Sequence, residues 1–220
     1  MNVLTSYTLR CLKQNRVRTL VTLIGIILSV ALFTAVAEGA WSGRQYLVDV
    51  IMAENGAYHG YFEELYPGKT EELRQQPEID RVETLTDLGW AWVNSESQVY
   101  PYLRLASMSE GFPALVTVRI KEGRMPENEN ELIVSDRATA CTGVEFQVGQ
   151  RLSVRVGRRV TAEGGEALGD YNPYMGEEET LIDAREGVYT IVGVYDRFSS
   201  DVEADAMPGS LALTAGAAVI

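Results

Sequence analysis

An apolar run without a charged residue, Leu20 to Ala37, constrains this chain more than any other stretch. As a helix rising 1.5 Å per residue it would reach roughly 27 Å, close to the ~30 Å hydrocarbon thickness of a bilayer. A buried helix of a soluble protein would normally carry a polar stripe, and this one does not. Only four hydroxyl side chains border or interrupt it: Thr19, Thr22, Ser29 and Thr34. The sequence therefore predicts a membrane-spanning helix over residues 19–41.

The flanks of the run predict its orientation. Residues 1–18 form a basic segment without an acid, whereas the first carboxylate, Glu38, follows the run. The basic side chains are Arg10, Lys13, Arg16 and Arg18. Because basic flanks stay in the cytoplasm, we expect a cytoplasmic N-terminus in a bacterial plasma membrane, with everything beyond Trp41 outside it.

A cleaved signal peptide is an alternative interpretation of the same start. Ala35-Val36-Ala37 could serve as a cleavage site, because small residues are typical there. The basic segment is long for a signal peptide, and the apolar run exceeds the roughly 7–15 residues of a usual signal-peptide core. A retained anchor is the favoured interpretation.

The charge of the chain is divided unevenly. It holds 19 basic and 31 acidic residues, a net −12, so removing the four basic residues of 1–18 leaves −16 for the remainder. An acidic outer part argues against nucleic acid as a partner and is compatible with cationic partners or with a simply solvated surface. Cys11 and Cys141 lie on opposite sides of the predicted span, so we expect no disulfide between them.

Beyond the span we expect a stalk helix over residues 42–56 and a mixed α+β domain over residues 57–220. A strand-helix-strand subdomain and a β-rich arm should make up this domain. Expected strands are Tyr58–Leu65, Arg81–Leu85, Trp90–Asn94, Gln98–Leu105, Val116–Ile120, Glu131–Val134, Arg151–Val160, Val188–Tyr195 and Leu211–Ile220. Expected helices are Thr70–Gln76, with Thr70 as its N-cap, and Asp136–Cys141. A flexible, glycine-rich loop over residues 161–186 should join the two strands of the arm.

Few residues suggest chemistry. Trp90 and Trp92 share a strand face and form either a ligand platform or, as we favour, part of a packed sheet. The single histidine, His59, is interpreted as structural or exposed. Two acidic clusters are interpreted as solvated loops. The first consists of Asp196, Asp201, Glu203 and Asp205, whose carboxylates are also of the type that binds calcium. The second is Glu177 to Glu179. No phosphate-binding loop of the G-x-x-x-x-G-K-[ST] type occurs, so we expect no ATP hydrolysis, no bound cofactor and no metal site in this chain.

Four segments, in order along the chain, carry a family resemblance. Leu9 to Ile26 resembles the entry into the first transmembrane helix of MacB-like and FtsX-like ABC transporter permeases. Glu122 to Pro126 together with Asn130 to Val134 is similar to the "G-R-x-P … N-E-I-V" segment of their extracytoplasmic domain. Val148 to Gln150 and Tyr189 to Val194 are similar to a turn and a strand of that domain, with Gln150 in place of the commoner acid. The motif residues are Gly123, Arg124, Pro126, Asn130, Glu131, Gly149 and Gly193, which we expect to shape turns or close packing.

The resemblance implies a permease that performs no chemistry itself. It implies a separate cytoplasmic ABC ATPase that binds and hydrolyses ATP, a second permease copy, the lipid bilayer and an unidentified extracytoplasmic substrate such as a peptide or lipoprotein. Family permeases have at least four spanning helices and this sequence has one, so we expect the N-terminal part of a longer protein or a truncated product. The alternatives are an anchored or secreted ligand-binding module without an ATPase, and a membrane-tethered hydrolase for which no catalytic residues are identified.

Overall fold

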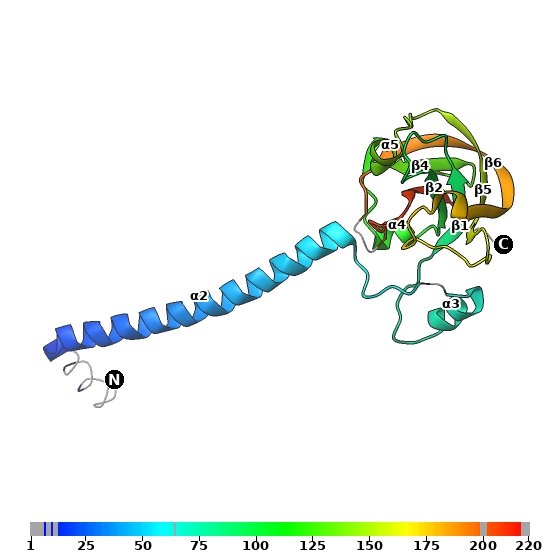
Figure 1. The fold of residues 1–220 in the computed structure, drawn as a ribbon. Helices are drawn as coiled ribbons and strands as arrows, with labels where there is room; N and C mark the ends of the chain where they lie inside the picture. The colour runs from blue at the N-terminus through cyan, green and yellow to red at the C-terminus, as the bar shows by residue number, and fades with distance from the viewer. Residues whose placement is uncertain (1–6, 8–9, 11–12, 64, 199–201, 217–220) are drawn as a thin grey trace. The chain divides into compact units, whose positions relative to one another are not determined.

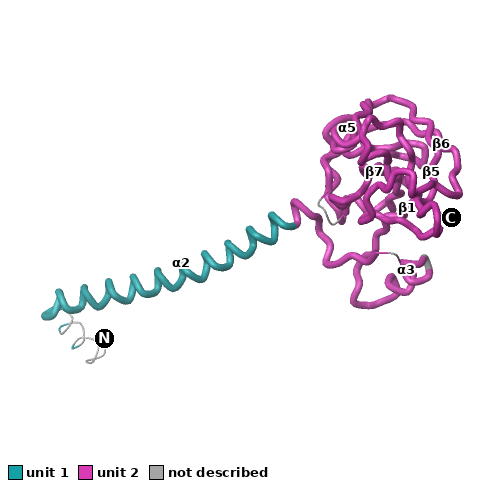
Figure 2. Tube along the Cα trace, viewed as in Figure 1, with its two compact units in different colours: residues 1–51 teal, residues 52–220 magenta. Residues whose placement is uncertain are grey.

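The computed structural model describes Tyr7, Arg10 and residues 13–63, 65–198 and 202–216. The chain forms two compact units, Met1–Ile51 and Met52–Ile220 (Figure 2). The described part of the first unit is helical, whereas the second is built on a sheet of seven strands (Figure 1). The protein is therefore a mixed α+β chain with one long N-terminal helix and a β-rich domain, as the sequence predicts.

Helix α2 (Arg16–Asn55) continues without a break through the apolar run and beyond it, over 40 residues. At 1.5 Å per residue this corresponds to roughly 60 Å. None of its residues is buried. The hydroxyls of the run are satisfied within the helix, because each donates to the carbonyl four residues earlier: Thr19, Thr22, Ser29 and Thr34. A helix surrounded by lipid needs its polar groups satisfied in this internal way.

The second unit starts with the last turn of α2. Gly56 follows that turn with a φ of 108°, and a Cβ there would lie 2.1 Å from the carbonyl oxygen of Leu115. The Ala57 N–H donates to the same oxygen at 2.6 Å, and the Arg119 guanidinium donates to the Ala53 carbonyl at 2.6 Å. The backbone therefore approaches so closely that only glycine fits at position 56.

The predicted strand-helix-strand subdomain is not formed. Its helix is present as α3 (Pro67–Arg74), but it begins before Thr70, so Thr70 is not the N-cap. The described residues of Tyr58–Leu65 form no strand, and the expected strand Arg81–Leu85 is largely irregular chain leading into β1 (Leu85–Trp92). The aromatic side chains of the first segment are mostly exposed, so it has no buried face to hold it in a sheet.

The seven strands form a sheet that closes on itself. In spatial order they are β3 (Ile120–Gly123), β6 (Glu179–Tyr195), β4 (Glu131–Ser135), β7 (Gly209–Ala215), β2 (Tyr102–Met108), β1 (Leu85–Trp92) and β5 (Arg151–Thr161). Because β5 also pairs with β6, six strands make a barrel and β3 pairs with β6 outside it. The pairs β2–β7 and β4–β6 are parallel, and the remaining pairs are antiparallel.

Several predicted elements are confirmed and others are shifted. Strands β4 and β5 confirm the predictions for Glu131–Val134 and Arg151–Val160, and α5 (Arg137–Thr142) confirms the short helix after β4. The prediction of a strand over Val116–Ile120 is wrong, because helix α4 (Phe112–Leu115) precedes it and only Ile120 enters β3.

The ends of four other strands also differ from expectation. Strand β1 begins and ends earlier in the sequence than the predicted Trp90–Asn94. Strand β2 begins and ends later than the predicted Gln98–Leu105. Strand β6 follows a short 3-10 helix, η1 (Gly176–Glu178), and starts at Glu179, so the predicted loop 161–186 is much shorter. Strand β7 covers the first part of the predicted Leu211–Ile220, whose last residues lie outside the described chain.

The core is divided between the two faces of the barrel wall. All six barrel strands contribute to one cluster, which therefore fills the interior: among others Ala91, Leu103, Leu105, Leu132, Val134, Val154, Ile191 and Ala212. A second cluster lies on the outer face of β2, β4 and β7, where Phe112, Val116 and Phe198 cover it. A third continues this outer face, with Ala204 and Met207 packed on Trp90 and Tyr102. The barrel wall is thus covered on both sides over much of its area.

Candidate functional site

The membrane-spanning candidate is helix α2, which is long and apolar enough to cross a bilayer. The four basic residues of the predicted cytoplasmic segment are described and exposed: Arg10, Lys13, Arg16 and Arg18. Most of the other residues of 1–18 lie outside the described chain. Their proposed role in orienting the helix stays a prediction.

The residues of the "G-R-x-P … N-E" motif lie together at the start of β4. Arg124 forms a two-pronged ion pair with Glu131, with nitrogen–oxygen distances of 2.8 and 2.7 Å. Pro126 is buried, and the carbonyl of Asn130 accepts the Thr190 N–H. The hydrogen bonds from Arg124 lower the pKa of the Glu131 carboxyl to about 2. The motif thus fixes the turn between β3 and β4.

The motif glycines lie at close backbone approaches near β6. A Cβ at Gly123 would lie 2.1 Å from the Val192 carbonyl oxygen, and one at Gly193 would lie 2.5 Å from that of Arg124. The Gly149 N–H donates to the Ile191 carbonyl at 2.7 Å. Each of these contacts organises the fold, and none faces the cavity described next.

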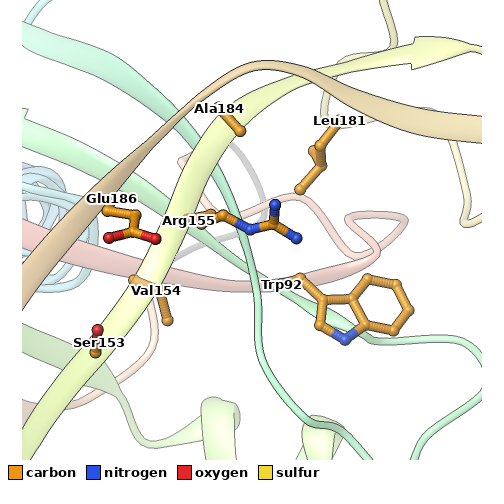
Figure 3. A pocket seen from close by; sticks show the side chains of 7 residues that line it. All are labelled: Trp92, Ser153, Val154, Arg155, Leu181, Ala184 and Glu186. Carbon is orange, nitrogen blue, oxygen red and sulfur yellow. The ribbon is translucent and has the colours of Figure 1, made fainter.

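A cavity of about 370 Å³ opens on the outer face of β1, β5 and β6 (Figure 3). Its lining is Trp92, Ser153, Val154, Arg155, Leu181, Ala184 and Glu186. It lies where the cover of the outer face ends, because Trp90 is 3% exposed and its same-face neighbour Trp92 is 47% exposed. The tryptophan pair is therefore partly packed core and partly cavity wall.

Trp92 belongs to a cluster of four aromatic rings that holds it in place. The Trp92 ring centroid lies 5.3 Å from that of Tyr102 and 5.9 Å from that of Tyr174, and Trp90 packs on Tyr102 at 5.9 Å. The contacts with Tyr102 are edge-to-face, an arrangement that aromatic quadrupoles favour. Trp92 is thus a supported aromatic surface.

A buried ion pair lies behind the aromatic cluster. Arg159 of β5 and Glu179 of β6 have fully buried side chains and are joined at 3.0 and 2.7 Å. The Arg159 guanidinium also stacks over Trp90, 4.8 Å from the ring centroid. Burial by itself raises the pKa of the Glu179 carboxyl, but hydrogen bonds from Arg159, the Met175 N–H and Tyr102 outweigh burial and lower it.

The same arginine fixes the loop between β5 and β6. Its remaining N–H groups donate to three loop carbonyls, those of Gly169, Asn172 and Pro173, at 3.1–3.3 Å. Asp170 of the same loop pairs with Arg104 of β2. The loop that the sequence predicts to be flexible is therefore tied down by two arginines, and Glu179 is not part of a solvated acidic cluster.

A bulge in β6 brings the charged residues to one face of the sheet. Between the pairs Val156↔Arg185 and Arg158↔Ile182, β5 has one residue and β6 has two. The extra residue reverses the alternation of side chains along β6. Consequently both glutamates lie on the outer face: Glu186 is opposite Arg155, and Glu179 pairs with Arg159.

The residues of the other predicted clusters are dispersed among separate contacts. His59 is exposed. Asp196 pairs with Lys121 and Asp205 with Arg197, whereas Glu203 is buried and accepts the Ser210 hydroxyl; Asp201 lies outside the described chain. Over the residues that are described, no group of three His, Cys, Asp or Glu side chains could hold a metal ion. Cys141 is a free thiol.

Sequence reasoning missed the two Arg–Glu neighbourhoods of β5 and β6. Alternation along β5 places Arg155 and Arg159 on the polar face of the strand, which is correct. It gives no signal that a loop covers Arg159, nor that a bulge places Glu186 on the same face of the sheet as Arg155. Comparison of the sequence with known protein families and with curated proteins gives no match.

Proposed function

We propose that this chain is the N-terminal part of an ABC permease subunit, which transmits movement from a partner ATPase at the inner face of a membrane to an extracytoplasmic domain. The single observation that carries the proposal is the unbroken helix α2. Its apolar run accounts for about half of its roughly 60 Å, so a stalk of comparable length remains beyond the lipid. A continuous helix can pass on a push or a rotation where a flexible linker could not.

The bonds at the start of the outer domain support this interpretation. Arg119 and the Ala57 N–H join residues 53–57 to the segment that leads into β3, and β3 pairs with β6. Movement of the last helical turn would thus reach the barrel through hydrogen-bonded backbone. The acidic outer domain then engages a substrate, and the ATPase and a second permease copy are the other proposed partners.

Cysteine labelling tests the topology. In a variant without Cys11 and Cys141, a single cysteine is placed at exposed Lys13 or at exposed Glu163. A membrane-impermeant maleimide applied to intact spheroplasts should label the Glu163→Cys variant and should label Lys13→Cys only after permeabilisation. The reverse pattern, or a protein released into the medium, contradicts the proposal.

An ATP-dependent signal tests the transmission of movement. Protein extracted from native membranes should co-purify with ATPase activity, and a spectroscopic label at Glu163→Cys should respond to ATP. Val48→Pro should abolish this response because proline breaks the stalk, whereas the control Val48→Ala should retain it. Consistent absence of an ATPase from such preparations contradicts the proposal.

An anchored ligand-binding module without an ATPase is the second candidate. The cavity at Trp92 favours it, because its size and mixed lining suit a small molecule. Ligand binding with no ATP-dependent response and no co-purifying ATPase would favour this candidate over the permease.

A further inference from the structure

Two opposite charges at the Trp92 cavity lack partners. Arg155 and Glu186 are directly opposed in the β5–β6 register, and both are exposed. Over the described part of the chain, neither side chain forms an ion pair or a hydrogen bond, with the other or with another residue. By contrast, two other arginines of the same strand do pair: Arg158 with Asp183, and Arg159 with Glu179.

The directions of the two side chains explain why they do not meet. In Figure 3 the Arg155 guanidinium extends away from Glu186, toward Trp92 and Leu181. The Glu186 carboxylate lies on the other side of the Arg155 backbone. A free cation and a free anion therefore line the same cavity at separate positions, in a domain where acids outnumber bases.

The rest of the cavity wall is mostly apolar and is supported. Trp92, Val154, Leu181 and Ala184 supply its apolar part, Ser153 adds a hydroxyl, and Trp92 is held by Tyr102 and Tyr174. Such a surface is ordered before a ligand arrives, which lowers the entropic cost of binding. The volume of about 370 Å³ lies within the range of roughly 300–1,000 Å³ found for small-molecule sites.

We propose that this cavity binds a small amphipathic zwitterion, of the class of apolar α-amino acids and short apolar peptides. The ligand carboxylate pairs with the Arg155 guanidinium, the ligand ammonium pairs with Glu186, and the apolar side chain packs on Trp92 and Leu181. Arginine suits this role because its planar N–H groups match a carboxylate in a two-pronged pair.

The charge pattern selects this class over simpler ligands. A purely anionic ligand would pair with Arg155 but approach Glu186, and a purely cationic ligand would meet the opposite problem. A neutral apolar ligand would bury Trp92 while partly desolvating two uncompensated charges, which is unfavourable. Only a ligand with both charges offsets both side chains. This binding goes beyond the proposed permease function and requires neither ATP nor a partner.

A fluorine NMR titration tests the proposal on the full chain in lipid nanodiscs. The probe is 4-fluoro-L-phenylalanine, and the two analogues are its N-acetyl derivative, which lacks the ammonium, and its carboxamide, which lacks the carboxylate. We expect saturable binding of the probe and about tenfold weaker binding of each analogue, corresponding to the loss of one charge-assisted contact. Absence of saturable binding, or equal binding of probe and analogues, overturns the proposal.

Paired variants assign each charge to its residue. Arg155→Gln should weaken binding of the probe to the level of the carboxamide and leave binding of the carboxamide unchanged. Glu186→Gln should weaken binding of the probe to the level of the N-acetyl derivative and leave binding of that derivative unchanged. The matched control is Arg158→Gln, which removes an exposed arginine that already pairs with Asp183. Binding that depends on Arg155 alone identifies an anion site and overturns the zwitterion proposal. An equal loss of binding in the Arg158→Gln control also overturns it. Unchanged thermal unfolding of the variants shows that any loss reflects binding, because both side chains are exposed.

Discussion

Strands β5 and β6 carry two Arg–Glu neighbourhoods on the same outer face, and the two behave in opposite ways. Arg159 and Glu179 are fully buried, and their ion pair is joined by three loop carbonyls and an indole ring. Arg155 and Glu186 are exposed and unpaired within the described chain.

The difference comes from cover and not from residue type. The loop after β5 closes over Arg159, and in the absence of water the guanidinium must find protein partners for all its donors. At Arg155 the cover has ended, so water satisfies the guanidinium and no internal partner is required. The first pair is therefore a structural element, whereas the second is available to a ligand.

Removing the buried arginine should have the largest effect on stability. Arg159→Met leaves Glu179 as an uncompensated buried charge and releases the loop, so we expect a loss of about 3–5 kcal/mol in the free energy of unfolding. Urea unfolding followed by tryptophan fluorescence measures it. The double variant Arg159→Met, Glu179→Leu should regain most of the loss, because it removes both charges; a double variant as unstable as the single one contradicts this account.

A substitution at the bulge between the two neighbourhoods should have the second largest effect on stability. A Cβ at Gly157 would lie 2.7 Å from the Ile182 carbonyl oxygen and 3.1 Å from Ala184 Cα, so Gly157→Ala must shift the bulged part of β6. We expect a destabilisation of about 1–3 kcal/mol, the range for overpacked sites. The matched control is Gly164→Ala, because a Cβ at position 164 would have its nearest contact at an ordinary 3.4 Å. The neighbouring Gly165 is unsuitable because its φ of 65° would strain an alanine. Equal effects at 157 and 164 would contradict the steric reason.

A third Arg–Glu pair, Arg124 and Glu131, should show a smaller, pH-dependent effect. The pKa of Glu131 is lowered to about 2, so its stabilising contribution is fully present above its ordinary pKa of roughly 4.3 and is lost as the pH falls toward 2. The stability gap between wild type and Glu131→Gln should therefore shrink between about pH 5 and pH 2. Unfolding midpoints measured across this range check it, and a gap independent of pH would be inconsistent with the paired state.

The smallest effect should come from the exposed neighbourhood. Arg155→Gln and Glu186→Gln remove no internal bond of the described chain, so we expect each to change the free energy of unfolding by less than about 0.5 kcal/mol. Parallel urea titrations of both variants and wild type measure this. A loss above about 1 kcal/mol for either variant would mean that the two side chains support the fold after all.

The sequence predicts the elements that depend on local pattern. The apolar run identifies α2, and regular alternation identifies β4 and β5, because side-chain periodicity is a local property. The strand-helix-strand subdomain was wrongly predicted because the segment around Tyr61 has the β-forming residues of a strand and no partner to pair with. Sheet closure, the covered face at Arg159 and the bulge in β6 all depend on contacts between distant residues, so alternation alone could not reveal them.

The place of β7 in the barrel has a consequence for how this domain is made. Among the described strands it comes last in the sequence, yet it lies between β2 and β4 in the closed sheet. Until residues 209–215 emerge from the ribosome, β2 and β4 each keep one edge whose backbone N–H and C=O groups are not paired with another strand. The domain therefore cannot mature gradually during synthesis, and a product cut off ahead of Gly209 should be prone to aggregation and proteolysis.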